Sequence, residues 1–282
     1  MKARVLDFLE HGGDVEALAL ELFEWQRSVS AVHRNFAAGV EPSTIYEIPA
    51  VPVRLCKEVV FCTASQGIDF RTSGTTGKRG LHRMADTQAY DRAARLQFEA
   101  CVPDAPTTAM NLCPTAADSS LGHMMRTLFP DATTTLPEGP VFIGTTASRA
   151  SEIPDVELPP GSVVMVTGGF KGSAPEELRL RERLGPHFRR IDEYGMTELS
   201  SQLWGAPGEG YLPPRWLVPY AVDAATGERT EGLGLLRFVD LANWSSLLAI
   251  ETEDVGEVRG GRVFLQGRLA KSEPRGCSLA VE

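Results

Sequence analysis

The sequence predicts an α/β fold, in which helices pack on a sheet, followed by a smaller β-rich region. Short apolar runs alternate with amphipathic stretches between residues 87 and 185, a pattern typical of α/β sheets. Segments rich in glycine and hydroxyl side chains lie at 70–80 and 167–169, as expected of ligand-binding loops at strand ends. Beyond residue 233, apolar runs are separated by Gly and Asp turns without an intervening helix, which favours antiparallel strands.

The first expected element is an amphipathic helix that Asp14 caps and Gly39 ends. Its apolar residues recur four and three positions apart and form one stripe: Leu18, Leu22, Trp25, Val29, Val32 and Phe36. Because this pattern lasts only about three heptads, packing on its own domain is favoured over a coiled-coil seam with another chain. The prolines in 48–53 then predict an extended connector.

The remaining elements follow in order along the chain. The pattern predicts helices at 87–101, 119–129 and 173–184, the last closed by Gly185, and strands at 108–113, 140–144 and 163–167. The later runs at 235–239, 247–250 and 263–265 are expected to form the small β-rich lobe. We therefore divide the chain into an α/β core (1–232), a β-rich lobe of the same unit (233–266) and a flexible C-terminal arm (267–282).

Composition excludes several classes of protein. The 282 residues are 43% apolar, enough for a sizeable core, and carry a net charge of −9 without a basic tract, so nucleic acid is not expected as a partner. No apolar run approaches the roughly 18 residues of a membrane span, and Asp7 lies where a signal peptide would be apolar. The five cysteines form no C-x-x-C pair. Reduced thiols in a cytoplasmic protein without a structural metal are the expectation.

The segment 70–80 reads Phe-Arg-Thr-Ser-Gly-Thr-Thr-Gly-Lys-Arg-Gly and carries the clearest functional signal. Glycines let the backbone approach a ligand closely, and hydroxyls, amides and a lysine together favour a polyphosphate. An ordinary P-loop is excluded, because only two residues separate Gly74 from Gly77 and Arg79 follows Lys78. The alternative is a flexible polar loop between two strands. The candidate phosphate-binding residues are Thr72, Ser73, Gly74, Thr75, Thr76, Gly77 and Lys78.

A second segment, Glu-Tyr-Gly-Met-Thr-Glu-Leu at 193–199, has complementary chemistry. Thr197 can donate a hydrogen bond to an α-phosphate, and Tyr194 can stack on adenine. Glu198 can hold magnesium, a hard cation that takes one or two carboxylates together with phosphate oxygens. Taken alone, the segment also fits a helix start with a threonine cap.

Together the two segments resemble the adenylate-forming, acyl-CoA synthetase-like enzymes, whose patterns are Thr/Ser-Ser-Gly-Thr-Thr-Gly-Lys and aromatic-Gly-x-Thr-Glu. The resemblance implies their layered α/β large domain, binding of ATP and magnesium, and activation of a carboxylic acid as an acyl-adenylate. It also implies that Gly168 and Gly169 flank adenine beside Gly195, that Asp254 accepts the ribose hydroxyls, and that Arg268 lies near ribose or phosphate. The glycine pair also fits a strand-to-helix turn, and Asp254 also fits a turn before Gly256.

The C-terminal sequence Arg-Gly-Cys-Ser-Leu at 275–279 resembles the acyl-protein synthetases of the LuxE type, as do 48–57, 195–202 and 240–243. This resemblance implies a fatty acid, a thioester on Cys277, and an acyl reductase or another acyl-acceptor protein as partner. It also implies a Cys-bearing tail in place of the superfamily's usual C-terminal domain, and a shortened N-terminal part. A thiolate does attack an acyl-phosphate anhydride readily, although Cys277 could also be an idle thiol. Transfer to coenzyme A, a carrier protein or an amine, and a non-catalytic nucleotide-binding subunit, are the alternatives.

Three further residues are weaker candidates. His123 follows Asp-Ser-Ser-Leu-Gly at 118–122, where related enzymes place a residue between acid and phosphate sites; a helix histidine packed against methionines is the alternative. Gly80 stands where the family's second loop lysine is expected. Pyrophosphate binding would therefore depend on Lys78, Arg79 or His82.

Overall fold

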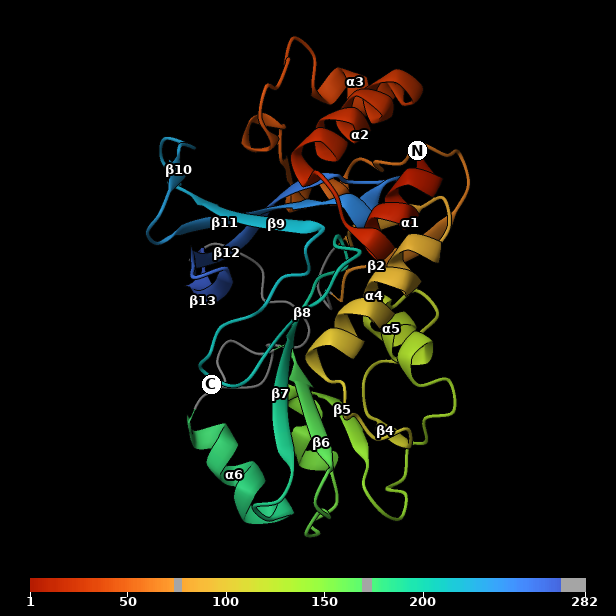
Figure 1. Cartoon of the computed structure of the whole chain (residues 1–282), viewed down its shortest axis with the longest axis vertical. Helices are drawn as coiled ribbons and strands as arrows, with labels where there is room; N and C mark the ends of the chain where they lie inside the picture. The colour runs from red at the N-terminus through yellow and green to blue at the C-terminus, as the bar shows by residue number, and fades with distance from the viewer. Residues whose placement is uncertain (74–77, 169–173, 270–282) are drawn as a thin grey trace.

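The computed structural model describes residues 1–73, 78–168 and 174–269. Three β-sheets, of six, five and two strands, and six α-helices build this part of the chain (Figure 1). The predicted roles of Gly74, Thr75, Thr76, Gly77, Gly169 and Cys277 lie outside the described residues. None of the helices in the described ranges is long and apolar enough to cross a membrane.

One sheet is the predicted α/β sheet, with the strand order β4-β5-β6-β7-β8. Its first four strands are parallel, and β8 is antiparallel to β7. The strands are β4 (Ala109–Asn111), β5 (Phe142–Thr146), β6 (Val163–Thr167), β7 (Arg189–Tyr194) and β8 (Leu203–Gly205). The helices are α4 (Gln88–Cys101), α5 (Ser120–Leu128) and α6 (Ala174–Leu184), each in a predicted range, and Gly185 follows α6 with φ 75° as expected of a helix end.

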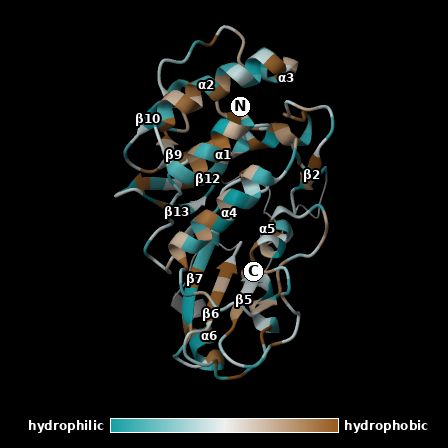
Figure 2. Ribbon diagram, turned by 45° about the vertical axis from the view of Figure 1, so that its right-hand side comes forward, coloured by the Kyte–Doolittle hydropathy of each residue, from teal (hydrophilic) through white to brown (hydrophobic). Residues whose placement is uncertain are grey.

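The two faces of this sheet are apolar and are covered by different helices. Phe142, Met165 and Ile191 pack in one cluster with side chains of α4 and α5, whereas Val164 pairs with Leu180 and Leu184 of α6 in another. This alternation is the period of two expected for a strand buried on both faces. In Figure 2 the apolar strand β6 is brown, whereas its neighbour β7 is teal.

The second sheet contains the predicted β-rich lobe and is larger than that lobe. Its order is β1-β12-β11-β9-β10, with β13 on the free side of β12. The predicted runs form β11, β12 and β13, which are antiparallel to one another as expected. The strands are β1 (Val51–Pro52), β9 (Leu217–Val222), β10 (Arg229–Thr230), β11 (Gly234–Asp240), β12 (Ala249–Arg259) and β13 (Arg262–Arg268). The predicted extended connector thus contributes β1, parallel to β12.

The N-terminal helices α1 (Lys2–His11), α2 (Val15–Val29) and α3 (Ala31–Phe36) lie above this sheet (Figure 1) and share its core. Asp14 caps α2 as predicted, since its carboxylate accepts the Ala17 N–H. The prediction of one continuous helix is wrong, because the backbone is extended at Ser30. There Ser30 Oγ bonds to the Cys62 carbonyl and to His33. These tertiary contacts override the helical pattern.

A short hairpin carries the glycine-rich loop. Strand β2 (Ile68–Arg71) pairs with β3 (Leu81–Met84) in an antiparallel register. The loop thus lies between two strands, as the alternative interpretation of its sequence stated, and this position does not decide between the two interpretations. Short 3-10 turns complete the described elements: η1 (Ile45–Glu47), η2 (Val53–Lys57), η3 (Ala147–Glu152) and η4 (Leu241–Asn243).

Candidate active site

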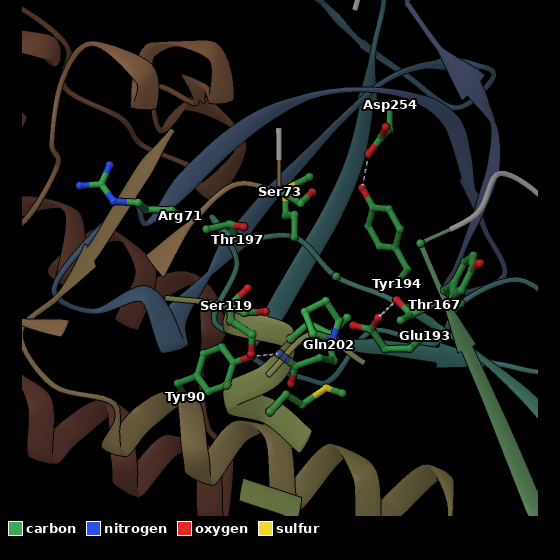
Figure 3. Close-up of a pocket in the computed structure, with 18 of the residues that line it drawn as sticks. Arg71, Ser73, Tyr90, Ser119, Thr167, Glu193, Tyr194, Thr197, Gln202 and Asp254 are labelled. Carbon is green, nitrogen blue, oxygen red and sulfur yellow. Dashed lines mark hydrogen bonds between the residues drawn. The ribbon is translucent and has the colours of Figure 1, made fainter. Parts of the chain in front are cut away.

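A cavity lies at the carboxyl ends of β6 and β7, where the two sheets approach each other (Figure 3). Parallel sheets place their ligand sites at this edge. Residues from the glycine-rich loop, from both sheets and from α4 and α5 line the cavity. The predicted site residues that it gathers are Ser73, Gly168, Tyr194, Gly195, Thr197, Asp254 and Arg268.

Asp254 is held on one wall of the cavity by two partners. The Tyr194 hydroxyl donates to Asp254 Oδ2 at 2.8 Å, and Arg268 Nε lies 3.0 Å from Asp254 Oδ1. Asp254 and Arg268 face each other across β12 and β13, and Arg268 also contacts Glu253 at 2.9 Å. Each carboxylate oxygen has two lone pairs. Asp254 can therefore still accept hydrogen bonds from two hydroxyls of a ligand.

The base of the glycine-rich loop is closed by hydrogen bonds. The Thr72 N–H donates to the Gly80 carbonyl at 3.0 Å, and the Gly80 N–H donates to Thr72 Oγ1 at 2.9 Å. A Cβ on Gly80 would come within 3.1 Å of the Thr72 methyl group, so a larger residue would crowd this closure. Arg79 reinforces it through Asp118, 3.0 Å away.

The three residues expected to bind pyrophosphate are not among those that line the cavity. Lys78 pairs with Glu58 at the surface, at 2.8 Å. Arg79 is engaged by Asp118. His82 is only 1% exposed, and burial lowers its pKa to about 4, so its ring is neutral at physiological pH. Among the described residues of the segment 70–80, Arg71 and Ser73 line the cavity, and Ser73 is one of the candidate phosphate-binding residues.

Hydrogen bonds to residues 240–243 hold the segment that follows Thr197. The Asn243 side chain donates to the Glu198 carbonyl at 2.8 Å. Asp240 accepts the Ser200 N–H at 2.9 Å and the Ser201 hydroxyl at 2.7 Å. Burial raises the pKa of Asp240 to about 6. Two segments that the sequence singled out separately therefore support each other in space.

Glu198, the predicted metal ligand, follows Thr197 but is only 3% exposed and is not among the lining residues. Burial, and then the charge of Glu198, raise the pKa of the Cys56 thiol, which places the carboxylate near Cys56. Within the described ranges no cluster of three or more His, Cys, Asp or Glu residues could hold a metal. A magnesium ion bound by one carboxylate and phosphate oxygens needs no such cluster. Glu198 has suitable chemistry, but this conformation does not present it to the cavity.

His123 is likewise not among the lining residues. Its Nε2 lies 2.6 Å from Asp91 Oδ1. The ring packs against Phe70 and Tyr90, with centroid distances of 5.3 Å to each. The structure thus places His123 behind the wall of the cavity, in contact with Tyr90, which is a wall residue.

Sequence reasoning missed a polar group on the opposite wall. Thr167 donates to Glu193 Oε2, and burial raises the pKa of Glu193 to about 7. Gln202 Nε2 donates to the Tyr90 hydroxyl at 3.1 Å, and that hydroxyl bonds to the Ser120 carbonyl at 2.9 Å. Glu193 stands directly before the Tyr194 motif. Strand alternation could have indicated that it faces away from Tyr194, as Figure 3 shows.

Comparison with known proteins agrees with this architecture. No family model matches the sequence, and no curated protein matches it. ATP-bound MatB from Rhodopseudomonas palustris has a TM-score of 0.54 at 13% identity, covering 73% of this chain and 49% of that one. O-succinylbenzoate coenzyme A synthetase from Bacillus subtilis, crystallised with ATP and magnesium, has a TM-score of 0.52 at 14% identity, covering 71% and 49%.

A third structure matches more of the chain. 2-Hydroxyisobutyryl-CoA ligase, in complex with 2-HIB-AMP and CoA, has a TM-score of 0.60 at 15% identity, covering 90% of this chain and 66% of that one. The chain spans about half the length of the first two structures. At these identities the likeness concerns the fold. The fold is that of the large domain of the adenylate-forming, acyl-CoA synthetase-like enzymes.

Proposed function

We propose that this chain activates a carboxylic acid with ATP and magnesium and then carries the acyl group on Cys277. The observation that supports the first step best is the cavity itself. It gathers Ser73, Gly168, Thr197 and Asp254, which the sequence singled out as parts of one nucleotide site. An unrelated pocket would have no reason to unite these segments.

In the proposed reaction, a carboxylate oxygen of the acid attacks the α-phosphorus of ATP and pyrophosphate leaves. Asp254 would accept the ribose hydroxyls, Tyr194 would contact adenine, and Thr197 would donate to the α-phosphate. Magnesium would neutralise charge on the departing phosphates. Because Glu198 is not among the residues that line the cavity, its role as a ligand requires a change of conformation when the nucleotide binds.

In the second step the Cys277 thiolate attacks the acyl carbonyl, a thioester forms and AMP leaves. The support is the chemistry of the thiolate and the resemblance of 275–279 to the acyl-protein synthetases. The acyl group would then pass to an acyl reductase or to another acyl-acceptor protein. A long-chain fatty acid is the substrate that this resemblance suggests.

Intact-protein mass spectrometry after incubation with ATP, magnesium and a panel of acids tests both steps. The wild-type chain should gain one acyl group, whereas Cys277→Ala should gain none and still release pyrophosphate for one turnover. Cys101→Ala, which removes a partly buried free thiol, is the matched control. A Cys277→Ala chain that still accumulates the thioester would refute the second step.

Glu198→Gln tests the metal role in the same assay. Loss of a metal-bridging carboxylate should slow acid-dependent pyrophosphate release on the order of 100-fold or more, with partial recovery at higher magnesium. Glu209→Gln, at an exposed turn, is the control. A wild-type rate of pyrophosphate release for Glu198→Gln would show that Glu198 does not bind the metal.

A further inference from the structure

The wall opposite Asp254 presents two oxygen acceptors to the cavity. Glu193 and Gln202 are 5% and 4% exposed, and both line the cavity. Gln202 uses its amide N–H₂ on Tyr90, and its Oε1 atom has no hydrogen-bond partner among the described residues. A buried acceptor without a partner destabilises the folded chain, because the acceptor has lost its hydrogen bonds to water. A ligand group that donates to it would restore such a hydrogen bond.

Glu193 lies beside this acceptor. A Cβ added at Gly195 would collide with Glu193 Oε1 and would come within 3.8 Å of Gln202 Cγ. Because Gly195 has no side chain, the Glu193 carboxylate can lie against it, next to Gln202. The charge of Glu193 also reaches the buried hydroxyl of Tyr90 and, after burial itself, raises its pKa.

No cationic side chain of the described residues balances Glu193. Burial and the Thr167 hydrogen bond are the influences on its pKa, and Thr167 occupies only Oε2. The arginines of the cavity wall are Arg71 and Arg268, of which Arg268 lies against Asp254 and Glu253 on the nucleotide side. A buried carboxylate without a counter-ion favours a cationic group on the ligand.

We propose that the acid activated here carries an amino group, whose ammonium form lies between Glu193 and Gln202. An ammonium has three donors and no acceptor, which matches two neighbouring oxygen acceptors. The cavity wall also includes the apolar side chains of Leu121, Met124 and Leu265. We therefore expect the rest of the acid, away from its amino group, to be apolar. This inference rests on the proposed function and replaces the fatty acid with an amino acid or another amine-bearing acid.

The test uses three acids with one carbon skeleton that carry an amino, a hydroxyl or a methyl group at the same carbon. Acid-dependent pyrophosphate release gives kcat/KM for each acid. The wild-type chain should prefer the amino acid over the methyl analogue by at least about 10-fold, and Glu193→Gln should reduce that preference by about 10- to 100-fold. Gln202→Leu should reduce it in the same direction, and Glu209→Gln should leave it unchanged.

Equal use of the amino and methyl acids, or an unchanged preference in both Glu193→Gln and Gln202→Leu, overturns the proposal. A preference for the hydroxyl analogue overturns the ammonium assignment. If no acid supports pyrophosphate release, the proposed function fails, and calorimetry decides the inference separately. Binding of the amine-bearing acid by wild type but not by Glu193→Gln would then support it, and absence of binding to wild type would overturn it.

Discussion

Glu193 is a carboxyl group that the fold holds away from water. Its pKa rises from 4.5 to about 7 on burial, and that of Asp240 rises from 3.8 to about 6. Between about pH 4 and 7 these two carboxyls bind more protons in the folded chain than in the unfolded chain, whereas buried His82 binds fewer. The contribution of the two carboxyls to the free energy of unfolding of the ligand-free protein should therefore fall as pH rises from about 4 to about 7.

Glu193→Gln should make the free energy of unfolding less dependent on pH in the upper part of this range. The effect is at most on the order of 3 kcal/mol, since one pKa unit corresponds to about 1.4 kcal/mol. Urea unfolding at several pH values between about 5 and 8 measures it, with Glu209→Gln as the control. Parallel curves for wild type and Glu193→Gln would show that this carboxyl titrates normally in the folded protein.

At the scale of one element, the Asp14 cap of α2 gives a direct test of what stabilises a helix. Asp14 accepts the Ala17 N–H at 3.0 Å and caps a helix whose Leu18 and Leu22 are buried. Asp14→Ala should lower the free energy of unfolding by about 1 kcal/mol, the usual effect of losing such a cap. Thermal or urea unfolding measures this loss, and Asp14→Ser should restore most of it. An Asp14→Ala chain as stable as wild type would mean that tertiary packing alone holds the start of α2.

Elements with a strong local pattern were predictable from the sequence. The strand at 163–167 was located without error, and the helix expected at 87–101 begins one residue later. The break at Ser30 was not predictable, because the Cys62 and Ser246 carbonyls that hold Ser30 and His33 come from distant parts of the chain. Val29 and Phe36 belong to the apolar stripe yet remain 48% and 37% exposed. The helix α1 was missed as well.

The residues of the candidate site likewise divide into those that the sequence predicts and those that it does not. Thr197 and Asp254 belong to chemically distinctive motifs, so their neighbourhood could be predicted before any fold was known. Tyr90 lies in an ordinary amphipathic helix, and Glu193 and Gln202 stand at the ends of segments that were singled out for other residues. Only the packing of α4 against the ends of β7 and β8 brings them together. A motif search therefore could not have found the wall opposite Asp254.

At the scale of the whole molecule, the cavity joins two sheets. Gly168 and Tyr194 belong to one sheet region, and Asp254 and Arg268 to the other. A nucleotide bound across them should stabilise the chain against global unfolding. At a concentration 100 times its Kd, ATP should raise the free energy of unfolding by about 2.7 kcal/mol.

Thermal unfolding with and without ATP and magnesium measures this effect. Asp254→Asn should require a higher ATP concentration for the same rise in Tm, whereas Glu209→Gln should respond like wild type. A Tm that ATP leaves unchanged at every concentration would argue against a nucleotide site between the sheets.

The end of β7 has a consequence for how such a protein can diversify. Tyr194 turns toward Asp254, and Glu193, one residue earlier, turns toward Thr167 and Gln202. Successive side chains of a strand point to opposite sides, so adjacent codons govern two separate chemistries. Under the proposed function, a substitution at 193 would change the choice of acid and leave the contacts of Tyr194 and Asp254 to the nucleotide intact. New substrates would then be accessible by single substitutions that retain the proposed activation step.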